Sequence, residues 1–190
     1  MTMLVLGLLL FLGIHSVSIV AGGLRNRMAA RSEFGWKALY SVVALVGFYF
    51  IVRGYAAARM EPVVLYLPPV WLRHVAALLL LPVFILFFAP YFPGRIKTVT
   101  RHPQLIAVKL WAVAHLLVNG TLADVVLFGS LLAWAVADRI SMKHRPTRPV
   151  AGAPATAIND VLLVVIGIAA YALMVTWLHK AWFGVAPFAM

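Results

Sequence analysis

The sequence predicts an all-α fold, a polytopic transmembrane bundle of about six helices, and its composition and apolar runs support this. Hydrophobic residues make up 64% of the 190 residues, and charged residues only 11%. Several apolar runs approach the roughly 20 residues that an α-helix needs to cross a bilayer. No hydrophilic stretch is long enough to form a separate soluble domain. We therefore expect one integral membrane domain over residues 1–190.

The expected spans follow the apolar runs along the chain. They lie near residues 2–22, 36–57, 70–92, 103–118, 121–138 and 159–179. The first run lacks the basic segment and the small-residue cleavage site of a secretory signal, so we expect it to be retained as a span. An irregular connector should separate the second and third spans, because Pro62, Pro68 and Pro69 lack the N–H group that a helix interior needs.

The ends of the fourth and fifth spans carry clear helix signals. Pro103 predicts the start of the fourth span, because proline in the first helical position leaves no N–H group unpaired. Asn119-Gly120 predicts a turn after that span, since glycine adopts a positive φ at little cost. Thr121 can then cap the fifth helix, and Asp124 suits its first turn, where backbone N–H groups lack partners.

The Lys and Arg residues predict the orientation of the bundle, because these residues concentrate in cytoplasmic loops. With the N-terminus outside, twelve of the 16 fall on the inner side and four on the outer side. The inner residues are Arg25, Arg27, Arg31, Lys37, Arg95, Lys97, Arg101, Lys109, Arg139, Lys143, Arg145 and Arg148, and the outer ones are Arg53, Arg59, Arg73 and Lys180. We therefore expect both termini to lie outside.

The formal net charge of +11 does not indicate a nucleic-acid partner. The basic residues flank apolar spans in short loops and do not form a stripe interleaved with aromatic residues. The expected partner of these spans is the lipid bilayer. Cysteine is absent, which excludes disulfides, thiolate ligands and a cysteine nucleophile.

Two histidines, His15 and His115, lie inside apolar spans and are the main indication of function. An ionisable side chain in a bilayer normally faces the bundle interior and marks a ligand, a proton path or a cofactor. At 1.5 Å per residue, His15 lies about 20 Å from the outer end of its span and His115 about 18 Å from the inner end of its own. These helices run in opposite directions, so the two imidazoles lie at similar depth. Such a pair can hold a b-type haem as its two axial ligands.

Other interpretations of the histidines stay open at this point. Each imidazole could instead bond to a polar group of a neighbouring helix. Zinc fits less well, because it needs three or four ligands and no acidic residue lies at that depth. At the inner end of the fourth span, Arg101 suits the headgroup region, whereas His102 suits either a ligand or substrate role or an interfacial or capping role.

Several motifs along almost the full length of the chain carry a resemblance to a known family. They include Phe11-Leu12-Gly13-Ile14-His15-Ser16, Arg101-His102-Pro103-Gln104, the segment Trp111 to Gly120 and Leu127-Phe128-Gly129. With these motifs the chain closely resembles the NnrU family of bacterial membrane proteins. This resemblance implies a protein of the bacterial inner membrane, so the outer side, on which the charge count places both termini, is the periplasm. It also implies a part in denitrification, in support of nitrite and nitric oxide reduction, with respiratory membrane proteins as partners.

The chain is also similar to the plastid zeta-carotene isomerase, a membrane haem b enzyme that converts a cis double bond of a carotenoid to trans. The haem-ligating histidines of that enzyme correspond to His15 and His115. A further shared motif contains Arg101 and His102. The resemblance therefore implies a haem b whose iron is bound by His15 and His115, with Arg101 and His102 as further cofactor-binding residues.

Three functions follow from these observations. The first is a haem b protein that supports nitrogen-oxide respiration, and the second is a haem-dependent isomerase of an apolar, carotenoid-like polyene. The third is an assembly factor without a cofactor. An S-adenosylmethionine-dependent methyltransferase, of the kind that acts on isoprenylcysteine, shares Arg-His-Pro but needs a later glutamate-bearing helix, and no glutamate follows Glu61 here.

Overall fold

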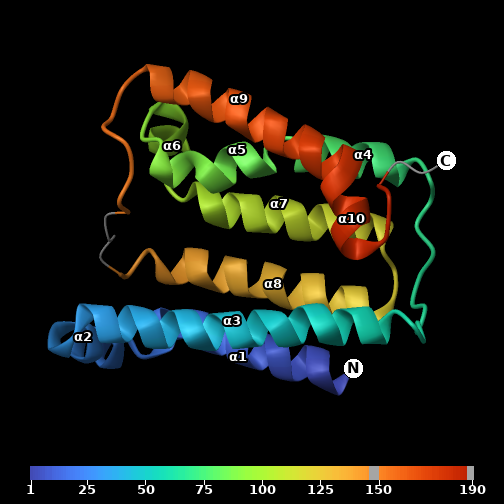
Figure 1. The fold of residues 1–190 in the computed structure, drawn as a ribbon, viewed down its shortest axis with the longest axis horizontal. Helices are drawn as coiled ribbons and strands as arrows, with labels where there is room; N and C mark the ends of the chain where they lie inside the picture. Colours follow the sequence, from blue (N-terminus) through green and yellow to red (C-terminus); the bar gives the residue numbers. More distant parts are fainter. Residues whose placement is uncertain (146–149, 188–190) are drawn as a thin grey trace. The chain divides into compact units, whose positions relative to one another are not determined.

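The computed structural model describes residues 1–145 and 150–187, which form helices and no strand, so the all-α prediction is confirmed (Figure 1). Arg148, one of the basic residues expected on the inner side, lies outside these residues. In the described part of the chain, four segments are long and apolar enough to cross a membrane. They are Thr2–Val20, Glu33–Ala58, Leu72–Tyr91 and Ile158–Phe183.

The fourth and fifth expected spans are also helical, but the fourth is too short and the fifth carries too many charges to count among these segments. Six spans are therefore not confirmed. Helix α7, Pro103–Val118, has 16 residues. It is about 24 Å long, against a hydrocarbon core of about 30 Å. Helix α8, Leu122–Ser141, has 20 residues but carries Asp124, Asp138 and Arg139.

The chain packs as two compact units, and each is described by itself. The first contains Met1–Tyr66 and Gly120–Ser141, and the second contains Leu67–Asn119 and Met142–Met190. One integral membrane domain over residues 1–190 stays a prediction.

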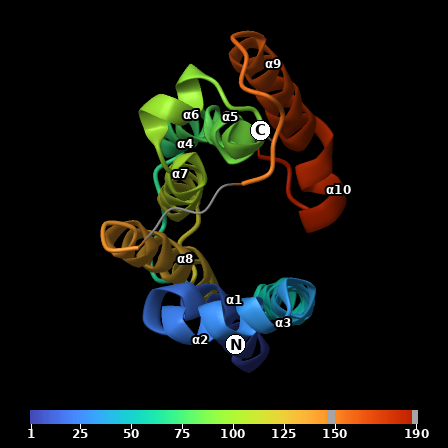
Figure 2. The ribbon, with the colours of Figure 1, turned by 90° about the vertical axis from the view of Figure 1, so that its left-hand side faces the viewer.

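The first unit is built on close packing between α1, Thr2–Val20, and α3, Glu33–Ala58, with α8 beside α1 (Figures 1 and 2). Glycines bring the backbones of α1 and α3 together. A Cβ atom on Gly47 would lie 2.7 Å from the backbone nitrogen of Phe11, and one on Gly7 would lie 2.5 Å from that of Ile51. Small residues at such crossings allow the close approach from which apolar helices gain their packing energy.

The first turn of α8 is held by a buried carboxylate. Asp124 accepts hydrogen bonds from the Thr121 backbone N–H at 2.8 Å and from the Tyr55 hydroxyl at 2.5 Å. The Asp124 N–H donates to the Thr121 hydroxyl oxygen at 3.3 Å, so the predicted cap is confirmed and is reciprocal. Because Tyr55 belongs to α3, the same carboxylate ties α8 to α3.

Gly120 has a different role from the predicted one. Among the described glycines only Gly184 has a positive φ, so Gly120 is not needed for turn conformation. The connector after α3 has no helix, as predicted, and it runs back to this point: the N–H groups of Leu65 and Tyr66 donate to the Gly120 carbonyl. A Cβ atom on Gly120 would collide with the Tyr66 carbonyl. The turn therefore requires glycine for close backbone approach.

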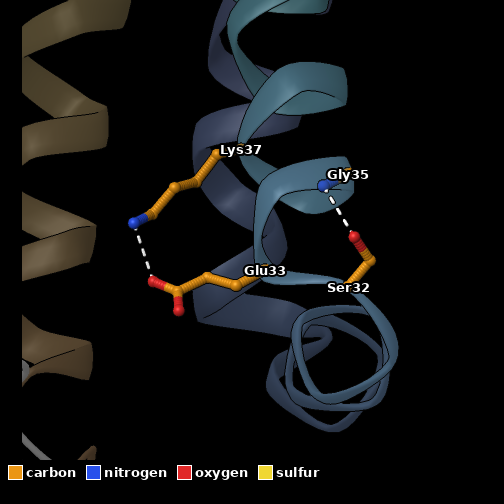
Figure 3. Close-up of polar contacts among 4 residues, drawn as sticks. All are labelled: Ser32, Glu33, Gly35 and Lys37. Carbon is orange, nitrogen blue, oxygen red and sulfur yellow. Dashed lines mark hydrogen bonds and ion pairs between the residues drawn. The ribbon is translucent and has the colours of Figure 1, made fainter.

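The short helix α2, Gly22–Arg31, was not among the expected elements. It joins α1 to α3 and contains no buried residue. Ser32 ends it and caps α3, because its hydroxyl oxygen accepts from the Gly35 N–H at 3.0 Å (Figure 3).

The second unit contains a broken third span. The expected continuous helix divides into α4, Leu72–Leu80, and α5, Val83–Phe88, followed by the 3₁₀ turn η1, Ala89–Tyr91. The break falls at Pro82, because proline has no N–H group to donate and its ring clashes with the preceding turn. In Figures 1 and 2, α5 lies beside α7 and α9, Ile158–Leu173, and its buried Val83 and Leu86 share a small core with Ala107 of α7.

The sixth expected span continues beyond α9. A π-helical turn, η2, covers Met174–Leu178, and α10 covers His179–Phe183. The start of α9 also holds α6, Arg95–Thr100, which was not among the expected elements. The Asp160 carboxylate accepts from the N–H groups of Arg95 and Ile96 at 2.8 and 3.1 Å. It therefore satisfies the first turn of α6 from a residue distant in the chain.

The α1/α3 crossing leads to a stability prediction. We expect Gly47→Ala to destabilise the protein by about 1–3 kcal/mol, because the new methyl group meets backbone atoms of α1 that cannot turn aside. Thermal unfolding in detergent should show a lower Tm. Gly129→Ala in α8 is the matched control, because no atom lies within 4 Å of the position of its new Cβ. Equal Tm values for Gly47→Ala and the wild type would contradict the close approach of α1 and α3.

Candidate functional site

His15 lies in an aromatic environment formed by three helices of the first unit. Its ring centroid is 4.2 Å from that of Phe11 on α1, 5.1 Å from Tyr40 on α3 and 5.7 Å from Trp134 on α8. The imidazole is partly buried. An intramembrane histidine is expected to face the interior of its bundle, and the rings around His15 agree with that expectation within this unit.

A hydrogen bond to its own helix determines the tautomer of His15. Nδ1 lies 2.6 Å from the backbone carbonyl oxygen of Phe11, four residues earlier. A carbonyl can only accept, so the Nδ1 atom carries the hydrogen and donates it. In the neutral ring the lone pair then lies on Nε2, which is the atom that can bind a metal.

His115 makes the same contact in the second unit. Its Nδ1 donates to the Trp111 carbonyl oxygen at 2.8 Å, again four residues earlier in the helix. Its ring lies 4.9 Å from the Trp111 ring, between centroids, and is partly buried. The two histidines therefore share one tautomer, and the Nδ1 contact of each is made within its own helix and not with a neighbouring one.

Three polar or aromatic side chains around His15 were missed from the sequence. Tyr40 and Trp134 contact the ring, and the buried Asp138 lies four residues after Trp134 in α8. The Trp134 indole nitrogen is buried and has no hydrogen-bond partner among the described residues. The available signal was the spacing of Trp134 and Asp138, which places both on one face of α8.

Arg101 and His102 form a strained corner between α6 and α7 in the second unit. Arg101 has φ 58° and ψ −51°, and the His102 N–H donates to the Thr100 carbonyl oxygen at 2.6 Å. This is a γ-turn of the rare, positive-φ kind. Such a conformation costs about 1–3 kcal/mol in a residue with a Cβ atom, and strain of this kind is found mainly at functional sites.

The start of α7 agrees with the sequence. The helix begins at Pro103, as predicted. His102 takes the N-cap position of α7 without a capping hydrogen bond from its side chain. The positive φ of Arg101 turns the chain sharply before α7, and the Arg101 side chain is exposed.

The four predicted cofactor-binding residues are divided between the units. His15 belongs to the first unit, whereas His115, Arg101 and His102 belong to the second. The pairing of the two histidines stays a prediction. Within residues 1–145 and 150–187, no group of three His, Cys, Asp or Glu side chains could hold a metal ion.

Comparison with known proteins gives a family match over nearly the whole chain. The family described as NnrU protein matches residues 3–187. The resemblance inferred from the motifs is thus confirmed. No curated protein and no solved structure matches the chain.

The strained corner leads to a second stability prediction. We expect Arg101→Gly to stabilise the protein by about 1 kcal/mol, because glycine adopts this positive φ without steric cost. Arg101→Ala is the matched control: it removes the guanidinium but keeps the Cβ atom, so its thermal unfolding should resemble that of the wild type. A Tm of Arg101→Gly at or below that of Arg101→Ala would show that residue 101 is not strained.

Proposed function

The chain belongs to the NnrU family, and from this premise we propose that it is an inner-membrane haem b protein that supports nitrite and nitric oxide reduction. His15 and His115 bind the iron. Electron transfer to respiratory membrane proteins is the proposed contribution to denitrification.

The observation that supports haem ligation best is the shared geometry of the two histidines. Each Nδ1 donates to the carbonyl oxygen four residues earlier, at 2.6 and 2.8 Å. Metal-bound histidines usually donate their second nitrogen to a carbonyl or carboxylate, which fixes the ring orientation and makes the metal-binding nitrogen more basic. Two neutral imidazoles with their lone pairs on Nε2 would be a suitable donor set for the iron of a haem b.

The residues around each histidine fit the same proposal. Haem b, when bound, supplies one-electron redox chemistry. Phe11, Tyr40 and Trp134 restrict the orientation of the His15 ring and keep water from it.

Arg101 and His102 are the proposed partners of the acidic groups of the cofactor. Haem b carries two carboxylates, and the planar guanidinium of arginine binds a carboxylate with two parallel hydrogen bonds. The γ-turn fixes the backbone from which the exposed Arg101 side chain extends. Strain at this corner is consistent with a side chain that is kept for binding.

We also propose six spans with both termini in the periplasm. Helix α8 can be included among the spans because its charged residues lie at its ends, with Asp124 in the first turn and Asp138 and Arg139 in the last. Asp124 is buried and hydrogen-bonded, which removes most of the cost of a carboxylate near lipid. The excess of Lys and Arg in the loops on one side of these spans sets the proposed orientation.

Haem ligation can be tested by absorption spectroscopy of the purified full chain from haem-replete cells. We expect a Soret band in the wild type, and haem that acidified solvent extracts because no cysteine is present to attach it covalently. His15→Ala and His115→Ala should each lower the haem content by about tenfold or more, because each removes an iron ligand.

His144→Ala is the control for this experiment, since that histidine is exposed in a loop and should leave the spectrum unchanged. A folded but colourless wild-type protein would contradict haem binding. A Soret band that survives in both alanine variants would assign the iron to other ligands.

The role in nitrogen-oxide respiration needs a separate test in a denitrifying bacterium that lacks its own family member. We expect the wild-type chain to restore nitrite and nitric oxide consumption, and the double variant His15→Ala/His115→Ala to restore less than about a tenth of it. Full restoration by the double variant would favour an assembly factor without a cofactor. Conversion of a cis carotenoid to its trans form by purified protein would instead favour the isomerase.

A further inference from the structure

The place of helix α2 in the chain indicates that it lies at the membrane surface. It connects α1 to α3, two of the segments long and apolar enough to cross a membrane. A helix between two consecutive spans lies where those spans leave the bilayer. None of the residues of α2 is buried, so its side chains are available to the surface at which it lies.

Helix α2 carries three arginines and no acidic residue. Glu33 is the only acidic residue in the segment 21–37, and its carboxylate pairs with Lys37 at 2.7 Å (Figure 3). Among the described residues, Arg25, Arg27 and Arg31 form no ion pair with any carboxylate. Three positive charges therefore remain on a helix of ten residues.

The pattern of side chains on α2 suits a helix that lies along a membrane surface. Leu24 and Met28 are four residues apart and form one row, and Arg27 and Arg31 form the adjacent row. Arg25 lies on the other side of the apolar row, and Leu24 is 47% exposed. In helices of this kind the apolar row enters the acyl region, and the basic residues reach the phosphates.

We propose that α2 is a binding surface for anionic phospholipid headgroups, with Arg25, Arg27 and Arg31 as the residues that hold the lipid phosphates. The guanidinium group matches a phosphate in shape and charge, because two of its N–H groups can donate to two phosphate oxygens together. Clusters of basic residues next to a membrane span favour anionic lipids by electrostatic attraction. The Ser32 cap marks the corner at which α2 ends and α3 begins (Figure 3).

The proposal is tested by native mass spectrometry of the full-length protein titrated with phosphatidylglycerol or with phosphatidylcholine of the same acyl chains. We expect the wild type to bind the first phosphatidylglycerol at least about tenfold more tightly than phosphatidylcholine. The variant Arg25→Gln/Arg27→Gln/Arg31→Gln should reduce this preference to within about twofold. Higher ammonium acetate concentration should weaken the wild-type preference, because salt screens the attraction.

The matched control is Arg53→Gln/Arg59→Gln/Arg73→Gln, which removes the same charge from three exposed arginines outside α2 and should keep the preference. No preference in the wild type, or an unchanged preference in the α2 variant, would overturn the proposal. Equal losses in the two triple variants would assign the attraction to net charge and overturn it as well. If the α2 triple variant does not fold, the three single variants decide, with a loss of about twofold to threefold expected for each.

Discussion

The constraint on which the rest of the structure depends is the cost of a polar group among apolar helices. Each such group needs a hydrogen-bond partner close at hand, because lipid and packed side chains offer none. Asp124 meets this need through Thr121 and Tyr55, and thereby ties α8 to α3. Asp160 meets it through the backbone of α6, which would otherwise begin with unpaired N–H groups. Asp124 and Asp160 therefore link helices by hydrogen bonds, in addition to the apolar packing between the helices.

The same constraint applies to His15 and His115, the two residues that we propose as haem ligands. In each histidine Nδ1 donates a hydrogen bond to a backbone carbonyl of its own helix. This contact selects the tautomer in which Nε2 carries the lone pair. In each ring Nδ1 makes the hydrogen bond that orients the imidazole, and Nε2 carries the lone pair that can bind a metal. A second feature is the strained backbone of Arg101, which has a positive φ. Arg101 belongs to the motif that the resemblance associates with cofactor binding. Proposals for haem and for its acidic groups rest on these two features.

Elements whose signals lie in the neighbouring sequence were predicted correctly. Elements that depend on residues distant in the chain were not. Pro103 correctly predicted the start of α7, and Thr121 the cap of α8. Helix α6 could not be predicted, because the carboxylate that caps it lies 65 residues beyond Arg95. Tyr40 was missed beside His15 because it belongs to a separate helix, and its place next to the imidazole depends on how α1 packs against α3. Gly120 was assigned to turn conformation, although the Tyr66 carbonyl, unknown from sequence, is what excludes a side chain there.

The central claim is that His15 and His115 together complete the coordination of one haem iron. It is tested most directly by electron paramagnetic resonance and resonance Raman spectra of the oxidised wild-type protein, with haem and protein quantified in the same sample. Coordination by two imidazoles predicts one haem per chain, six-coordinate and low-spin, in both spectra. A five-coordinate, high-spin haem in the wild type, or a folded protein without haem, would contradict the claim.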